Sequence, residues 1–420
     1  MNRTVNIIGG GTVSYVRNHL ALCAPAYGTT AGALHYRCVQ RFDKMDTKMF
    51  LTRMAGGAPN LETNEDVARL LNRLVADPAT RIIFMSAALC DFEGRIGDEA
   101  GKYASRLKTA EGEQTMLLTP ADKLIGRIRK DRKDIFLIGF KTTTNATEDE
   151  QYIAGLNLCK RAGCNLVLAN DTITRVNMIV TPEEARYHVT KNRDTVLDAL
   201  VDMTWHRTHL NFTRSTVVDG TPVPWNDERV PSALRQVVDY CISRNAYKPF
   251  NGATAGHFAC KLDDTTFLTS IRKTNFNDLD KNGLVLVKTD GPDSVLAYGA
   301  KPSVGGQSQR IVFHDHPGYD CIVHFHCPLL PGSDVPTVSQ REFECGSHQC
   351  GNQTSKGLKK FGNLKAVYLD QHGPNIVFNH SIDPQEVISF IEANFDLSQK
   401  TGGYVSLPEP SVSNNQATSF

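Results

Sequence analysis

Two histidines, His324 and His326, lie two positions apart in the apolar stretch 321–328. We expect this stretch to form a short buried strand, in which side chains i and i+2 point to the same face. A third histidine, His372, follows another apolar run and precedes Gly373, where the backbone can turn sharply. Three imidazoles that leave a position for a fourth ligand are typical of catalytic zinc, because structural sites fill the tetrahedron with protein ligands. The sequence therefore predicts that these three residues bind zinc or another divalent metal; the alternative is that they are ordinary core or surface histidines.

Small and polar residues at strand ends form a second candidate site. The run Gly9-Gly10-Gly11-Thr12 follows the first expected strand, and glycine amides can approach and bind a phosphate closely. A glycine run also serves a tight turn, so both interpretations stay open. Later strands end in small residues and a polar side chain at 87–92, 139–145 and 169–172. In open α/β sheets, ligands bind at such carboxyl ends.

The elements that would position these strand ends alternate between buried strands and helices. The expected strands are 5–8, 81–85, 134–138 and 165–168, and the expected helices lie near 28–41, 63–76, 120–130 and 148–162. Continuous apolar strands separated by helices are typical of a mostly parallel sheet with both faces covered. We therefore expect an α/β fold, with a Rossmann-like sheet in the first half of the chain.

The second half of the chain predicts a separate domain. A polar stretch with several prolines suggests a linker at 206–230. Beyond it we expect a helix at 232–244 and short strands at 256–262, 265–269, 283–288 and 294–298. The end of the chain is rich in Pro, Ser and Asn, which predicts a disordered tail. The expected organisation is a domain at 1–205, the linker, a domain at 231–400 and a tail at 401–420.

Composition narrows the class of protein. The 420 residues suffice for two or three cores, and 46 Lys and Arg nearly balance 45 Asp and Glu, which argues against a nucleic-acid partner. The N-terminus lacks the apolar core of a signal peptide, and no apolar run reaches membrane length. We therefore expect a cytoplasmic protein with no membrane partner, whose 11 cysteines are reduced.

The first half resembles phosphopantothenate–cysteine ligase over about residues 1–205. That enzyme joins cysteine to 4′-phosphopantothenate after activating the carboxylate with a nucleoside triphosphate. The matching pieces are, in order, Gly10-Gly11-Thr12, Val16-Arg17, the Ala-Ala-x-x-Asp-Phe run ending at Asp91-Phe92, Gly139-Phe140-Lys141, and Ala169-Asn170 with Arg175 beyond. The resemblance implies a place in coenzyme A biosynthesis, ATP or CTP as the nucleotide, and binding of nucleotide or phosphopantothenate by Gly10, Gly11, Thr12, Arg17, Asp91, Phe140, Lys141, Ala169, Asn170 and Arg175.

This half departs from the ligase pattern at reacting positions. The asparagine that handles the acyl-nucleotide intermediate falls on Ala21, and the glutamate after the Gly-Phe motif becomes Thr143. Two alternatives follow: an active ligase that tolerates Ala21, or a domain that binds these ligands without joining them.

The second half resembles the class II aldolase and adducin family over about residues 230–400. The resemblance is carried by the order of a helix, short strands, Lys301-Pro302-Ser303, His324-x-His326-x-Pro328 and Gln371-His372-Gly373. It implies a class II aldolase-type α/β/α domain whose zinc ligands are the same three histidines. In that family zinc polarises a carbonyl or enediolate oxygen while an acidic residue moves a proton at carbon.

This half also departs from its family, because the usual catalytic glutamate is Gly305. Glu344, in a loop expected near the metal, and Tyr404, which matches a C-terminal tyrosine of the family, are the expected catalytic replacements. The expected substrate-binding residues are Lys261, Ser270 and Ser303.

Together these features predict a zinc-dependent lyase, epimerase or dehydratase acting on a small anionic oxygenated substrate, fused to a phosphopantothenate- or nucleotide-binding domain. The alternatives are a catalytically reduced binding or assembly protein that keeps both folds, as adducin does, and an active ligase. Both families build sites partly at subunit contacts, so we expect a homo-oligomer.

Overall fold

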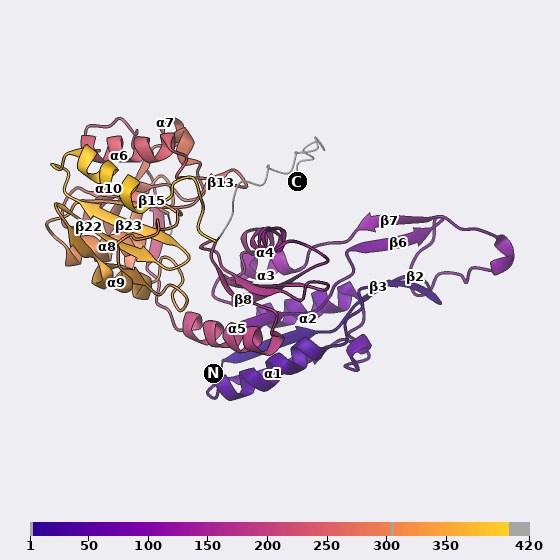
Figure 1. Ribbon diagram of the computed structural model, residues 1–420. Helices are drawn as coiled ribbons and strands as arrows, with labels where there is room; N and C mark the ends of the chain where they lie inside the picture. The colour runs from indigo at the N-terminus through magenta and orange to yellow at the C-terminus, as the bar shows by residue number, and fades with distance from the viewer. Residues whose placement is uncertain (1–2, 304–305, 403–420) are drawn as a thin grey trace. The chain divides into compact units, whose positions relative to one another are not determined.

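The chain separates into two compact units. The computed structural model describes residues 3–303 and 306–402, with only the backbone of 306–308. The first unit consists of Met1–Pro182 with Arg186–Thr208, and the second consists of Glu183–Ala185 with His209–Phe420. Each unit has its own large sheet, so each is described by itself (Figure 1).

The first unit is built on a seven-stranded sheet of order β11-β10-β9-β8-β5-β1-β4. Its strands are β1 Thr4–Gly9, β4 Asp46–Leu51, β5 Thr80–Met85, β8 Phe136–Thr143, β9 Leu166–Asp171, β10 Asn177–Val180 and β11 Arg186–Thr190. From β4 to β9 neighbouring strands are parallel, and β10 and β11 add an antiparallel edge. The expected mostly parallel α/β sheet is confirmed.

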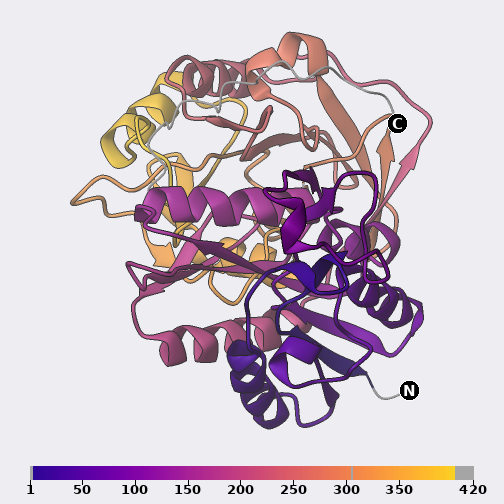
Figure 2. The same cartoon turned by 90° about the vertical axis from the view of Figure 1, so that its right-hand side faces the viewer.

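Helices cover both faces of this sheet. They are α1 Thr29–Arg41, α2 Asn64–Ala76, α3 Ile125–Asp131, α4 Glu148–Ala162 and α5 Arg193–Thr208. Helices α1 and α5 pack together on one face, and α3 packs beside α4 on the other; Figure 2 shows α4 and α5 on opposite sides of the sheet. Because both faces are covered, central strands such as β1 are buried along their whole length, which explains why their sequences are mostly apolar.

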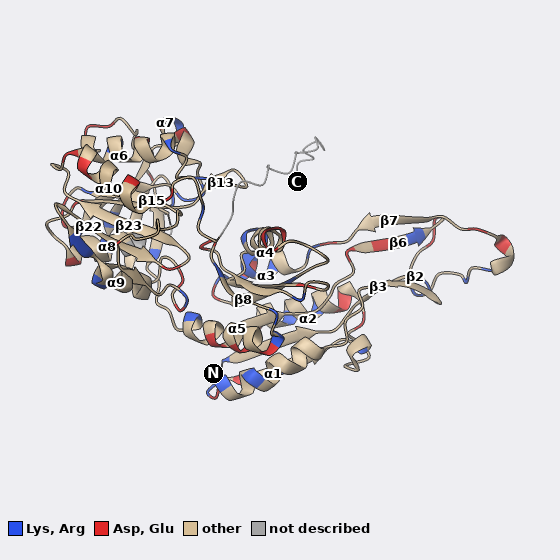
Figure 3. Cartoon of the chain, in the orientation of Figure 1, with Lys and Arg blue, Asp and Glu red and all other residues tan. Residues whose placement is uncertain are grey.

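Opposite charges join α1 to α5. Arg37 pairs with Asp194 and Asp198, and Arg41 pairs with Asp202, at N–O distances of 2.6–2.8 Å. In Figure 3 the ribbon of α1 is blue at its basic residues and the ribbon of α5 is red at its acidic residues. Ion pairs as exposed as these contribute little stability each, so the buried apolar faces carry the packing.

Two hairpins that the sequence did not predict follow the strand ends. They are β2 Val13–Arg17 with β3 Leu20–Cys23, and β6 Phe92–Ile96 with β7 Met116–Pro120. β2 contacts β6. The short helix η1 Arg53–Ala55 lies between β4 and α2, and η2 Thr109–Glu111 lies between β6 and β7.

The second unit is built on a mostly antiparallel sheet of order β12-β18-β17-β16-β15-β19-β23-β22-β20, with β21 paired to β22. The strands are β12 Arg214–Val218, β15 His257–Lys261, β16 Thr266–Ser270, β17 Leu284–Thr289, β18 Ser294–Tyr298, β19 Cys321–His324, β20 Thr337–Val338, β21 Lys359–Phe361, β22 Leu364–Leu369 and β23 Gly373–Phe378. A separate two-stranded pair consists of β13 Pro249–Phe250 and β14 Ala253–Thr254.

Helices again lie on both sides of the sheet, which makes an α/β/α arrangement. They are α6 Ser232–Ser243, η3 Phe276–Asp278, α7 Leu279–Asn282, α8 Gly306–Asp315, α9 His348–Gly357 and α10 Pro384–Asn394. Helices α6 and α10 pack together over one core, and α8 packs beside α9 over the other (Figure 1). The central strand β19 is fully buried between the two layers.

The expected linker at 206–230 is wrong. Helix α5 runs to Thr208, and β12 is an edge strand that pairs in parallel with β18. Beyond it Val223 exchanges backbone hydrogen bonds with Leu284, and Trp225 is 6% exposed. The segment reads as a linker because its polar residues occupy an edge strand and turns, where only a few side chains need to be apolar.

Candidate functional site

Three elements of the second unit bring the histidines together. His324 is the last residue of β19, where it pairs with His257 of β15 and Asn375 of β23. His326 lies two residues beyond the strand, so β19 is shorter than the strand expected over 321–328. His372 lies in the turn between β22 and β23.

The three imidazoles form one buried cluster. Ring centroids are 5.0 Å apart for His324 and His326, and 4.6 Å apart for each pair that includes His372. One ligand atom from each ring lies within 4.8 Å of the other two, and the side chains are 1–6% exposed. The residues selected by spacing therefore do meet in space.

The turn that presents His372 depends on Gly373. The backbone φ of Gly373 is +143°, and a Cβ atom there would lie 2.1 Å from the carbonyl oxygen of Phe325. Gln371, on the other side of His372, also has a positive φ of 57°. A side chain at 373 would push this turn away from the chain that carries His326.

The cluster fits a divalent cation. Nδ1 of His324 lies 2.6 Å from the Pro374 carbonyl oxygen, which can only accept, so Nδ1 carries the proton and Nε2 keeps its lone pair. Among the described residues, that buried Nε2 has no hydrogen-bond partner. Burial lowers the pKa of His324 well below its usual value, and the neighbouring imidazoles lower it further. Neutral imidazoles with buried lone pairs are the donor set that zinc prefers.

A fourth histidine that the sequence did not single out adjoins the cluster. The ring of His257 lies 4.8 Å from that of His324, and burial lowers its pKa to about 3. Gln309 accepts from Thr269 through Oε1, so its Nε2 faces Nδ1 of His257, at 2.6 Å, as a donor. The neutral His257 then carries its proton on Nε2. Only the pairing of β15 with β19 reveals this neighbour, because the two histidines are 67 positions apart.

Three residues outside the expected set also border the cluster. Glu184 is 2% exposed, and its Oε2 lies 3.7 Å from Nδ1 of His326 and 2.5 Å from Nζ of Lys400. Thr401 donates through its amide to the His326 carbonyl oxygen at 3.1 Å and through Oγ1 to the His372 carbonyl oxygen at 2.9 Å. Lys400 and Thr401 are therefore parts of the site, although Thr401 was expected to belong to the tail, and residues 403–420 lie outside the described part of the chain. No motif in the sequence signalled these two residues.

Of the expected substrate-binding residues, Lys261 is wrongly placed. It lies at the opposite end of β15 from His257, pairs with Asp264 and is therefore about 13 Å along the strand from the cluster. Ser270 and Ser303 are instead neighbours, because the Ser303 amide donates to the Ser270 carbonyl oxygen at 2.9 Å. Both hydroxyls are buried without a hydrogen-bond partner among the described residues, so they are available to a ligand.

Of the two expected catalytic residues, Glu344 and Tyr404, Glu344 lies in the described part of the chain. Glu344 lies, partly exposed, in the turn before α9, and the next residue, Cys345, donates its amide to Glu183 at 2.7 Å. The metal-binding cluster found in the described part of the chain consists of the histidines and does not include Glu344. Tyr404 and Gly305 lie outside the described residues.

In the first unit, the carboxyl ends of β8 and β9 bring four expected residues together. Lys141 is in register with Ala169, and Phe140 and Asn170 are their neighbours on the two strands. Arg175 follows in the next turn with a positive φ of 62°. Asp91 pairs with Lys123 near the start of β6.

The glycine run after β1 does not form an open phosphate loop. The amides of Gly11 and Thr12 already donate to the carbonyl oxygens of Ala26, at 2.7 Å, and Ala88, at 3.0 Å. A Cβ on Gly11 would lie 2.0 Å from the Ala24 carbonyl oxygen, and one on Gly10 would lie 2.1 Å from Oγ1 of Thr52. The expectation that the amides of Gly11 and Thr12 bind phosphate is therefore wrong, and the run serves tight backbone packing.

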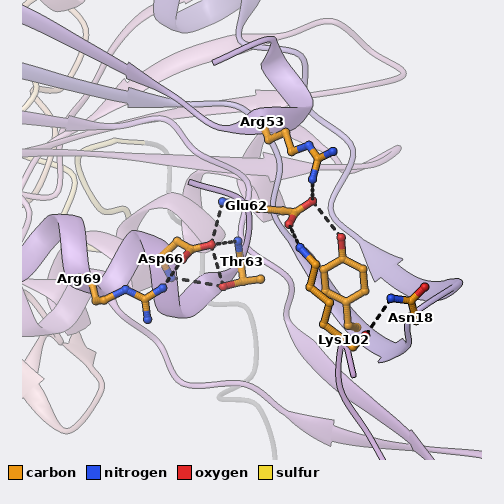
Figure 4. A network of polar contacts seen from close by, with 8 residues as sticks. Asn18, Arg53, Glu62, Thr63, Asp66, Arg69 and Lys102 are labelled. Atoms are coloured by element: carbon orange, nitrogen blue, oxygen red, sulfur yellow. Dashed lines mark hydrogen bonds and ion pairs between the residues drawn. The ribbon is translucent and has the colours of Figure 1, made fainter. Parts of the chain in front are cut away.

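Arg17 also has a structural role in this unit. Its buried guanidinium donates to three backbone carbonyls, those of Val16, Ile96 and Glu99. The hairpin that carries it is held by Glu62, which accepts from Tyr15, Arg53 and Lys102 at 2.9–3.1 Å; Figure 4 shows this network beside the Thr63–Asp66 capping box of α2. The hydrogen bonds of Arg17 thus hold β2 against β6 rather than presenting the guanidinium to a ligand.

Comparisons with known proteins confirm both resemblances. Residues 235–382 match the family described as Class II Aldolase and Adducin N-terminal domain. The N-terminal region matches the coenzyme A biosynthesis bifunctional protein CoaBC of Thermococcus kodakarensis, with 30% identity over 111 residues, or 26% of each chain. The present chain thus matches only about a quarter of that relative's length.

Solved structures resemble each half at low identity. The DNA/pantothenate metabolism flavoprotein from Streptococcus pneumoniae is 16% identical, covering 48% of this chain and 97% of its own, with a TM-score of 0.40. YgbL from Escherichia coli, described as a putative aldolase/epimerase/decarboxylase, is 18% identical, covering 38% and 84%, with a TM-score of 0.30. L-fuculose 1-phosphate aldolase is 15% identical, covering 38% and 81%, with a TM-score of 0.30. In the part of the chain that the structure describes, no helix is both long and apolar enough to span a membrane.

Proposed function

We propose that the second unit is a metal-dependent enzyme of the class II aldolase type, a lyase, epimerase or dehydratase for a small anionic oxygenated substrate. The observation that carries this proposal is the meeting of three buried imidazoles, those of His324, His326 and His372. A divalent cation such as zinc, held there, supplies a Lewis acid for a carbonyl or enediolate oxygen. The match of 235–382 to the aldolase and adducin family, which spans all three histidines, supports the assignment.

The chain's own residues then have distinct tasks. The Nε2 proton of His257 is a hydrogen-bond donor at the edge of the cluster, and the hydroxyls of Ser270 and Ser303 bind the anionic part of the substrate. Glu344 and Tyr404 remain our proposed proton carriers. A homo-oligomer would let the C-terminal tyrosine of one copy serve another.

The experiment that tests this function combines metal analysis with hydrogen exchange. We expect the purified chain to bind one zinc per molecule and to exchange a carbon-bound hydrogen with D2O in at least one member of a panel of sugar phosphates and hydroxy acids, followed by NMR. His324→Ala should lose both properties, with exchange falling by about two orders of magnitude or more. His314→Ala is the matched control, because that imidazole is 87% exposed.

Two results would argue against this function. A wild-type chain that binds no zinc contradicts the metal site itself. Zinc binding without exchange in any substrate favours the alternative, a binding or assembly protein that keeps the fold without the chemistry.

For the first unit we propose binding of phosphopantothenate or a nucleotide at the ends of β8 and β9. The observation that favours it is that the ends of these strands place an exposed Lys141 in register with Ala169, and Thr142 in register with Asn170. Ala21 lies in the β2–β3 hairpin opposite Tyr15 and offers no side-chain amide, so we expect binding without ligation. Titration with CTP, ATP and phosphopantothenate tests binding, and Lys141→Ala should weaken it about tenfold. Cysteine-dependent release of pyrophosphate would instead show an active ligase.

A further inference from the structure

Among the described residues, Glu184 is a buried acidic side chain whose carboxylate approaches the histidine cluster, with Oε2 3.7 Å from Nδ1 of His326. It lies outside the family-matched region 235–382, as does its partner Lys400. Its φ of +67° is in the left-handed region, which non-glycine residues seldom adopt and which is commonly retained at functional sites. This carboxylate therefore needs an explanation that the three histidines do not supply.

The distance between Glu184 and His326 is characteristic of two ligands of one cation. At 3.7 Å, Oε2 and Nδ1 are too far apart for a good hydrogen bond. Two donors bound about 2.0–2.2 Å from a tetrahedral zinc lie about 3.3–3.5 Å apart. This approach is to His326, and the potential ligand atoms that all lie within 4.8 Å of one another are those of the three histidines.

Lys400 explains how a carboxylate can be kept in this place. Both side chains of the Glu184–Lys400 pair are 2–3% exposed, and burying such a pair costs desolvation energy that the attraction only partly offsets. The next residue, Thr401, binds the carbonyl oxygens of His326 and His372. Residues 400 and 401 therefore hold the carboxylate and the two histidine backbones in one arrangement.

We propose that Glu184 is a fourth protein donor to the cation of the histidine cluster, with Lys400 holding its carboxylate in position beside the cluster. This inference rests on the metal site proposed above. Zinc can expand from four to five ligands, so a fourth protein donor still leaves room for a substrate oxygen. The site would then take a divalent cation through three nitrogens and one oxygen.

The test measures the metal directly and does not depend on catalysis. Zinc affinity is measured by competition with a chromophoric chelator, and the donor set is read from the visible d–d absorption of the Co²⁺-loaded full chain. Glu184→Gln should weaken zinc binding by about tenfold or more and change the Co²⁺ spectrum. Glu183→Gln is the matched control, because this adjacent buried carboxylate accepts from the Cys345 amide; it should alter neither.

Further variants keep the outcome decisive. If Glu184→Gln fails to fold because Lys400 is left buried without its carboxylate, the double variant Glu184→Gln with Lys400→Met removes both charges and should show the same loss. Lys400→Met alone should keep the Co²⁺ spectrum of the wild type. An unchanged zinc affinity and an unchanged spectrum in Glu184→Gln overturn the proposal, and weaker binding with an unchanged spectrum does so too, because it would make Glu184 a positioning residue. A wild-type chain without metal would instead refute the proposed function.

Discussion

At the scale of single residues, Gly373 decides whether the cluster can form. Its φ of +143° lies outside the range that other residues adopt, and the space beside its Cα is occupied by the Phe325 carbonyl oxygen. The residues on either side of this contact belong to two different histidine-bearing segments, Phe325-His326 and His372-Gly373. The close approach of the two backbones places the ring centroids of His326 and His372 4.6 Å apart.

We predict that Gly373→Ala weakens or abolishes metal binding. The added Cβ cannot be accommodated without moving a backbone, and the strained φ alone costs roughly 1–3 kcal/mol. Zinc stoichiometry and the urea midpoint of the full chain measure both effects. Gly318→Ala is the control, since its Cβ would meet no atom within 4 Å and its φ is not in the left-handed range. A Gly373→Ala chain with wild-type zinc affinity would show that the close approach is not needed.

At the scale of elements, the turns that follow β12 contribute to the core of the second unit. Trp225 packs edge-to-face against Phe258 of β15, with centroids 5.5 Å apart, and its Nε1 donates to Asp239 of α6 at 3.0 Å. The same strand β15 carries His257 beside the cluster. The segment therefore supports the sheet that positions the site.

We predict that Trp225→Ala destabilises the chain by about 3–5 kcal/mol, because it leaves a large cavity in a buried aromatic cluster. Urea unfolding of the full chain measures the change. Trp225→Phe keeps the apolar ring and loses only the hydrogen bond to Asp239, so about 1–2 kcal/mol is expected there. A change within 0.5 kcal/mol for the alanine variant would mean that the segment is a linker after all.

At the scale of the whole molecule, each unit contains one of the two tryptophans. Trp205 lies in α5 of the first unit, and Trp225 lies in the core of the second. The proposed cation site belongs to the second unit, and the proposed nucleotide or phosphopantothenate site belongs to the first. Fluorescence can therefore report on the second unit alone once Trp205 is replaced.

We predict that zinc stabilises the unit that contains Trp225. In the Trp205→Phe chain, zinc at 100 times its Kd should contribute about 2.7 kcal/mol and raise the thermal midpoint of Trp225 fluorescence by roughly 5–10 °C. A chelator should reverse the shift. No shift at saturating zinc would contradict a metal site in this unit, and His324→Ala, which should show none, is the reference.

The sequence alone determined the elements whose signals are local. The strands expected at 5–8, 81–85 and 165–168 and the helices at 28–41 and 148–162 correspond closely to β1, β5, β9, α1 and α4, because buried parallel strands and amphipathic helices carry their pattern within a few residues. The three histidines were also found from spacing, since a His-x-His pair and a His before Gly are short-range features. The polar edge strand β12 and the two hairpins lack such a pattern.

Tertiary structure alone decided what surrounds the histidines. His257 reaches His324 through strand pairing, and Glu184 and Lys400, which are 216 positions apart, meet in a buried ion pair. It also decided that Lys261 lies at the wrong end of its strand and that the Gly11 amide is already bonded. The physical reason is that these relations depend on which strands pair, in what register, and on which carbonyls approach an amide, and no local run of residues encodes them.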